Sequence, residues 1–97
     1  MKFDKVCVVG LGYIGLPTAA VISASGVNVV GLDVDERVIR TINSGKIHIV
    51  EPDLDIAVKD AVLSGFLTAS VEYLSADVFI IAVPTPFKNV IEDNIPK

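Results

Sequence analysis

The ten residues VCVVGLGYIG, from Val6 to Gly15, decide the fold of this chain. Its first four residues are apolar and mostly β-branched, which is typical of a short strand buried in a parallel sheet. The pattern G-x-G-x-x-G follows directly, and a helical stretch continues from about Tyr13 to Ser25. A strand, a glycine-rich turn and a helix in this order predict the first half of a βαβ unit.

The three glycines of the turn have different physical roles. The first permits the tight turn, the second lets main chain approach a diphosphate without a Cβ in the way, and the third lets the helix pack closely on the sheet. The start of the helix offers unpaired amides and the positive end of the helix dipole to an anion. We therefore predict that a dinucleotide diphosphate is bound by Gly10, Gly12, Tyr13, Ile14 and Gly15.

An acidic residue follows the second apolar strand, at residues 27–32. This residue, Asp33, lies 18 residues beyond Gly15. A carboxylate here accepts hydrogen bonds from the adenosine ribose and repels a 2′-phosphate, which favours NAD over NADP. Arg37 is the competing signal, because an arginine can pair with that phosphate; the adenosine edge and nearby acids are its other partners. The alternative interpretation makes the glycines ordinary turn residues and Asp33 a helix cap.

The rest of the chain alternates between helical and extended patterns. We predict helices over residues 35–44 and from Pro52 to 64, with Pro52 as the first helical residue, and strands at 67–71 and 78–83. The fold class is α/β, a Rossmann-type doubly wound parallel sheet of which residues 1–97 form the N-terminal half. Residues 72–77 are too few for an ordinary helical crossover. Thr85 follows the fourth strand, where a turn role and a ligand role are equally open.

Composition and charge exclude several classes of protein. The 97 residues are 52% hydrophobic, which argues against disorder, and the net charge of −4 argues against nucleic acid as a partner. No apolar stretch reaches the roughly 20 residues that span a bilayer. The single cysteine, Cys7, is expected to be a buried core thiol, has no metal-ligand spacing around it and cannot form an internal disulfide. A cytoplasmic protein without a membrane partner or a metal is expected.

Three segments resemble the UDP-glucose/UDP-mannose dehydrogenase family: VVGLGYIGLPTA (8–19), the strand end at Asp33, and IAVPTP (81–86). The resemblance covers essentially the whole chain. It implies that Tyr13, Ile14, Asp33 and Thr85 contact NAD, and that a sugar C6 alcohol is oxidised to a carboxylate with two NAD. Residues 41–54 and 82–88 are similar to the subfamily whose substrate is UDP-N-acetyl-D-mannosamine, used for bacterial surface polysaccharides such as enterobacterial common antigen.

The sequence also departs from this family. Many relatives carry a basic residue five positions after the strand-end acid, where this chain has Val38, with Arg37 one position earlier. The family's catalytic cysteine and lysine and its UDP-binding domain lie beyond residue 97, so we expect the N-terminal part of a longer homo-oligomeric enzyme, inactive by itself and without catalytic residues. The alternatives are a non-catalytic NAD-binding regulatory module, another enzyme such as UDP-glucose 6-dehydrogenase, or a hydroxyacid dehydrogenase, which residues 82–88 disfavour.

Overall fold

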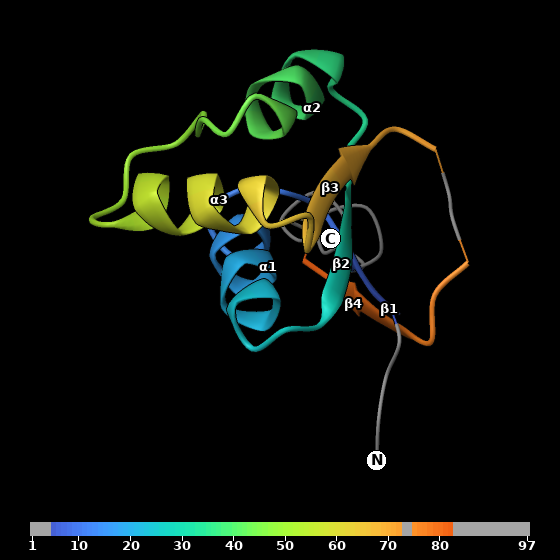
Figure 1. The fold of residues 1–97 in the computed structure, drawn as a ribbon. Helices are drawn as coiled ribbons and strands as arrows, with labels where there is room; N and C mark the ends of the chain where they lie inside the picture. Colours follow the sequence, from blue (N-terminus) through green and yellow to red (C-terminus); the bar gives the residue numbers. More distant parts are fainter. Residues whose placement is uncertain (1–4, 73–74, 83–97) are drawn as a thin grey trace, which may run out of the picture.

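A parallel four-stranded sheet forms the centre of the computed structural model, which describes residues 5–72 and 75–82 (Figure 1). The strands are β1 (Lys5–Val9), β2 (Asn28–Leu32), β3 (Leu67–Ser70) and β4 (Val78–Ile81). Their order across the sheet is β3-β2-β1-β4, and every neighbouring pair is parallel. The chain therefore moves outward from β1 to β3 and then returns to the opposite side of β1.

Three helices cover one face of this sheet: α1 (Gly15–Ala24), α2 (Glu36–Asn43) and α3 (Leu54–Leu63) (Figure 1). Among the described residues no helix lies on the other face, where the ends of the β3–β4 connection run instead. Because the crossovers from β1 to β3 all place their helices on the same side, the structure is one half of a doubly wound sheet. The predicted fold class is confirmed.

The hydrophobic core lies between the sheet and the three helices. On β1, Val6 and Val8 point toward the helices, whereas Cys7 lies on the opposite face and is also fully buried. Alternation of this kind follows from the period of two along a strand. The helices contribute the buried side chains Leu16, Ala19, Ala20, Ile42, Leu54, Val58 and Ala61.

Two predicted helix starts are wrong. Helix α1 begins at Gly15, two residues after the predicted start near Tyr13, and Pro17 is its third residue, in the first turn, where proline is tolerated. Helix α3 begins at Leu54, and the preceding Asp53 has a left-handed backbone with a φ of 64°. A chain turning through that conformation cannot already be helical at Pro52. The sequence rule for proline at a first helical position therefore fails here.

The parallel register brings the carboxyl ends of three strands to one edge. Val9 at the end of β1 pairs with Leu32 of β2 and with Ile81 of β4. In the connection before β4, residues 71–72 and 75–77 contain no helix. None of the helices in the described part of the chain is both long and apolar enough to cross a membrane.

Candidate functional site

The glycine-rich turn connects the end of β1 to the start of α1 at the carboxyl edge of the sheet. Gly10 has a φ of 97°, a conformation that glycine adopts without steric cost. Its amide donates a hydrogen bond to the carbonyl oxygen of Leu32, with a nitrogen–oxygen distance of 2.7 Å. The turn is thereby fixed to the neighbouring strand β2, as the predicted role of Gly10 requires.

Gly15 and Gly12 have contrasting surroundings. A Cβ at Gly15 would overlap the carbonyl oxygen of Gly10 and lie 3.3 Å from Cβ of Ala82, just after β4. Among the described residues, a Cβ at Gly12 would meet no atom within 4 Å. Gly15 is therefore required for packing inside the protein, whereas the space above Gly12 is open to a ligand that approaches the main chain.

The amides at the start of α1 are available to such a ligand. Ile14 precedes the first helical residue, and no side chain in the part of the chain that the structure describes caps this end of the helix. Within the described residues, no hydrogen bond engages the amides of Gly12, Tyr13 or Ile14. The side chains of Tyr13 and Ile14 are both exposed. A diphosphate would find three main-chain donors and the positive end of the helix dipole here.

Asp33 lies beside this turn. One carboxylate oxygen, Oδ2, accepts a hydrogen bond from the amide of Leu11 at 3.0 Å, and Oδ1 accepts one from the amide of Asp35 at 3.0 Å. A carboxylate oxygen accepts about two hydrogen bonds, so each oxygen of Asp33 keeps about one free position. Two such positions suit the two hydroxyls of a ribose, and the residues present therefore fit an adenosine dinucleotide.

Arg37 is paired with a local acid. In the first turn of α2, its Nη2 lies 3.2 Å from Oδ2 of Asp35, and its Nε donates to Oδ1 at 3.3 Å. Asp35 also caps the helix, because Oδ1 accepts a hydrogen bond from the Arg37 amide at 2.9 Å. Of the partners considered for Arg37 from the sequence, the structure shows the nearby acid.

A contact under the turn is missing from the sequence prediction. The side chain of Leu11 is fully buried and lies against Gly31 of β2, where a Cβ would come within 2.6 Å of Cδ2 of Leu11. Gly31 thus makes room for the residue that also donates its amide to Asp33. A glycine inside an apolar strand is a signal of such close approach. Thr85, the remaining predicted site residue, lies outside the described residues.

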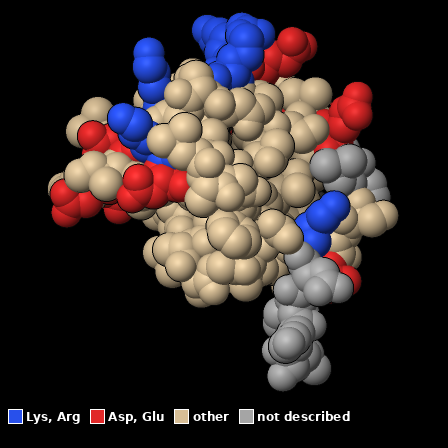
Figure 2. Space-filling model, in the orientation of Figure 1, with Lys and Arg blue, Asp and Glu red and all other residues tan. Residues whose placement is uncertain are grey.

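Charge on the protein surface does not compete with this main-chain site. On the face shown in Figure 2, basic and acidic side chains are interspersed around α2 and α3, and no continuous basic surface appears. Among the described residues, no group of three His, Cys, Asp or Glu side chains could hold a metal ion. Cys7 is buried in β1, and this burial raises the pKa of its thiol. Phosphate would therefore be bound by amides rather than by lysine or arginine clusters.

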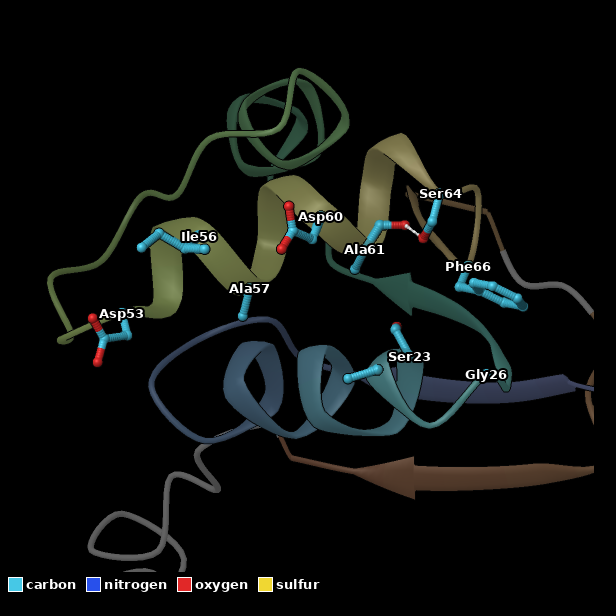
Figure 3. A pocket seen from close by; sticks show the side chains of 10 residues that line it. Ser23, Gly26, Asp53, Ile56, Ala57, Asp60, Ala61, Ser64 and Phe66 are labelled. Atoms are coloured by element: carbon cyan, nitrogen blue, oxygen red, sulfur yellow. Dashed lines mark hydrogen bonds between the residues drawn. The ribbon is translucent and has the colours of Figure 1, made fainter.

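An open apolar groove of about 710 Å³ lies elsewhere, between α1 and α3 (Figure 3). Ile56, Ala57 and Ala61 of α3 line one side, and Ser23 and Gly26 line the end of α1. None of the predicted site residues borders it. The groove and the glycine turn are therefore separate surfaces.

A glycine turn with open amides, together with an acid at the end of the second strand, defines a dinucleotide-binding domain of the Rossmann class. Residues 4–95 match the model of the UDP-glucose/GDP-mannose dehydrogenase family, NAD binding domain. The chain belongs to this family, and NAD is its cofactor. The name of this family contains GDP-mannose, whereas we expected UDP-mannose from the sequence.

Individual relatives agree with this assignment. The chain is 56% identical, over 87 residues, to UDP-N-acetyl-D-mannosamine dehydrogenase of Campylobacter jejuni, and 55% identical over 87 residues to NDP-N-acetyl-D-galactosaminuronic acid dehydrogenase of Ralstonia nicotianae; each match covers 90% of the chain. The structure of UDP-N-acetyl-mannosamine dehydrogenase from Staphylococcus aureus matches 84% of the chain with a TM-score of 0.82 and 46% identity. The chain spans about a fifth of the length of these relatives (20–21%).

Proposed function

We propose that this chain is the cofactor-binding part of a nucleotide-sugar 6-dehydrogenase that oxidises UDP-N-acetyl-D-mannosamine to UDP-N-acetyl-D-mannosaminuronate with two NAD. The observation that carries the proposal is the open space above Gly12 beside three unengaged amides and the Asp33 carboxylate. Two NAD molecules, bound one after the other, would each accept one hydride, one for each oxidation step. The residues of this chain bind and orient it.

Each part of the site is assigned to one part of the cofactor. The amides of Gly12, Tyr13 and Ile14 donate to the diphosphate at the positive end of α1. Asp33 accepts hydrogen bonds from the adenosine ribose, and its negative charge disfavours a 2′-phosphate. Gly10 and Gly15 hold the turn against the sheet, so that these groups lie at the same carboxyl edge. Thr85 is expected at the same carboxyl edge because it follows the fourth strand in the sequence, and its contact with NAD is what the resemblance implies.

Isothermal titration calorimetry of the chain with NAD and NADP tests this assignment. The wild-type chain is expected to bind NAD more tightly than NADP. Asp33→Asn keeps one side-chain acceptor. This variant is expected to bind NAD more weakly and to show a smaller difference in affinity between NAD and NADP. Equal affinity of the wild-type chain for NAD and NADP would contradict the role of Asp33.

The sugar substrate is proposed from the relatives. The 56% identity to a UDP-N-acetyl-D-mannosamine dehydrogenase supports UDP-N-acetyl-D-mannosamine. The 55% identity to an NDP-N-acetyl-D-galactosaminuronic acid dehydrogenase supports an N-acetylgalactosamine-type substrate almost equally, and makes it the second candidate. The proposed UDP-N-acetyl-D-mannosaminuronate product would serve a bacterial surface polysaccharide, of which enterobacterial common antigen is one example. UDP-glucose is the less favoured third substrate.

The substrate is tested on the protein at its natural length. Purified enzyme given NAD and one nucleotide sugar at a time is expected to form two NADH per UDP-N-acetyl-D-mannosamine consumed. Turnover of the N-acetylgalactosamine nucleotide alone would replace the first candidate by the second. Residues 1–97 alone are expected to form no NADH with either sugar, and NADH formation by that chain would refute our expectation that it is inactive by itself.

The cellular location and the oligomeric state are part of the same proposal. We place the enzyme in the cytoplasm, where NAD is available and where a lone thiol such as Cys7 stays reduced. We expect a homo-oligomer at natural length, as the family resemblance implies. Light scattering of the natural-length protein measures its mass, and a monomer would contradict this expectation.

A further inference from the structure

Asp35 engages Arg37 through both of its carboxylate oxygens. Oδ2 lies 3.2 Å from Nη2, and Oδ1 accepts from Nε at 3.3 Å and from the Arg37 amide at 2.9 Å. The guanidinium is therefore held in a fork by the same side chain that caps α2. The two groups perturb each other, because the hydrogen bond from Arg37 lowers the pKa of Asp35 and the acid raises the pKa of Arg37.

This pair is tied to the proposed ribose site through the main chain. The amide of Asp35 donates to Oδ1 of Asp33 at 3.0 Å, so the paired acid directly adjoins the carboxylate assigned to the ribose. In Rossmann domains that use NADP, an arginine near this strand end accommodates the 2′-phosphate. The side chain of Arg37 is 83% exposed. The chain thus carries the residue type that binds NADP at a position where its charge is already engaged.

We propose that Asp35 is a positioning residue that keeps Arg37 paired and thereby acts as a second determinant, beside Asp33, of the preference for NAD. This inference rests on the proposed function, in which Asp33 holds the ribose. Nε and Nη2 of Arg37 already donate to Asp35, so a 2′-phosphate that approaches the guanidinium also meets the Asp35 carboxylate, whose negative charge repels it. Removal of this one charge is expected to release Arg37 for the phosphate.

Asp35→Asn is the variant that separates this role from helix capping. Asparagine is as good an N-cap as aspartate and has the same shape, so α2 keeps its cap while the negative charge is lost. Glu36→Gln is the matched control. It removes the same charge one residue further along the chain, from a side chain whose Oε1 lies 3.9 Å from Nη1 of Arg40.

Calorimetric titration with NAD and with NADP is performed on the wild-type chain, D35N, E36Q, R37Q and the double variant D35N/R37Q. The expected result is a fall of about threefold in the NADP dissociation constant of D35N, the scale of one exposed charge pair, with NAD nearly unchanged. The gain is expected to disappear in D35N/R37Q, and E36Q is expected to behave as wild type.

Each other outcome has one meaning. Equal weakening of both cofactors by D35N assigns Asp35 to the structure of α2 alone and overturns the inference. A gain in NADP affinity that persists in D35N/R37Q, or that E36Q reproduces, shows a general charge effect and also overturns it. If D35N binds NADP as weakly as the wild-type chain, the inference is overturned as well. Failure of the wild-type chain to bind NAD at all would instead refute the proposed function.

Discussion

The carboxylate of Asp33 and the amide of Leu11, 22 residues apart in the chain, are joined by a hydrogen bond of 3.0 Å. This bond connects the end of β2 to the glycine turn after β1. Since Asp33 also accepts the amide of Asp35 at 3.0 Å, the carboxylate cannot rotate away from the turn without leaving two donors unsatisfied. The acid and the turn therefore form one preorganised unit.

The two neighbouring glycines of this turn are expected to respond differently to alanine. Gly15→Ala places a Cβ on the carbonyl oxygen of Gly10, and the fold is expected to lose about 3 kcal/mol of stability. The Cβ of Gly12→Ala meets no atom of residues 5–72 and 75–82 within 4 Å, so this change should leave stability within about 0.5 kcal/mol of wild type. The same methyl group is expected to lower the affinity for NAD at least about tenfold, or about 1.4 kcal/mol. Urea unfolding and calorimetry measure the two effects, and normal NAD affinity in Gly12→Ala would contradict the site.

A side chain forms hydrogen bonds with the main chain of the edge strand β3. Asn43, at the end of α2, donates from Nδ2 to the carbonyl of Ala69 at 2.9 Å and accepts the Ala69 amide on Oδ1 at 2.8 Å. Asn43→Ala removes both bonds and is expected to cost about 1–2 kcal/mol in urea unfolding. Asn28→Ala is the control, because the Asn28 side chain is exposed and forms no hydrogen bond within the described part of the chain. Equal costs for the two variants would show that the Asn43 bonds add nothing.

The left-handed backbone at Asp53 reverses the usual ranking of glycine and alanine. Its φ of 64° favours glycine, so Asp53→Gly is expected to be about 1 kcal/mol more stable than Asp53→Ala. Inside α3 the order is expected to invert, with Asp55→Ala about 1 kcal/mol more stable than Asp55→Gly. Each comparison removes the same charge from both members, so only the backbone differs. Thermal unfolding that gives the same order at both positions would show that Asp53 is not left-handed in solution.

The Asp35–Arg37 pair predicts a pH dependence of known sign. The pKa of Asp35 in the folded chain lies below its ordinary value, chiefly because of the side-chain hydrogen bond from Arg37. The stability from this pair is therefore present above the unfolded-state pKa and is lost as the pH falls through the folded-state pKa. Carboxyl NMR titration is expected to show a higher Asp35 pKa in Arg37→Gln and no change in Arg40→Gln. An unchanged pKa in Arg37→Gln would mean that the pair does not persist in solution.

The elements of the fold were predictable because their signals are local. An apolar run, a glycine pattern and an acid at a strand end each depend on a few adjacent residues, and the parallel sheet follows from their order. The start of α3 was not predictable, because Asp53 adopts a left-handed backbone conformation that the neighbouring residue types do not indicate. Strand β4 was predicted to run to Val83, but the structure ends it at Ile81, and Ala82 is no longer in the strand.

The residues of the proposed site were chosen from the sequence, whereas the contacts between them were not predictable from it. The fit of Leu11 against Gly31 and the bond from Leu11 to Asp33 depend on the register between β1 and β2, which no short pattern contains. The pairing of Arg37 could be narrowed from the sequence only to nearby acids or the adenosine. Its choice of Asp35 follows from the capping geometry of α2, which brings that carboxylate to the amide of the arginine itself.

The central claim is that NAD binds at the glycine turn, and an NMR titration of the amide resonances with NAD tests it most directly. The account predicts that the largest shift changes occur at Gly12, Tyr13 and Ile14, while Ile56 and Ala57 in the groove between α1 and α3 stay in place. Unchanged turn amides, with changes confined to that groove, would contradict it.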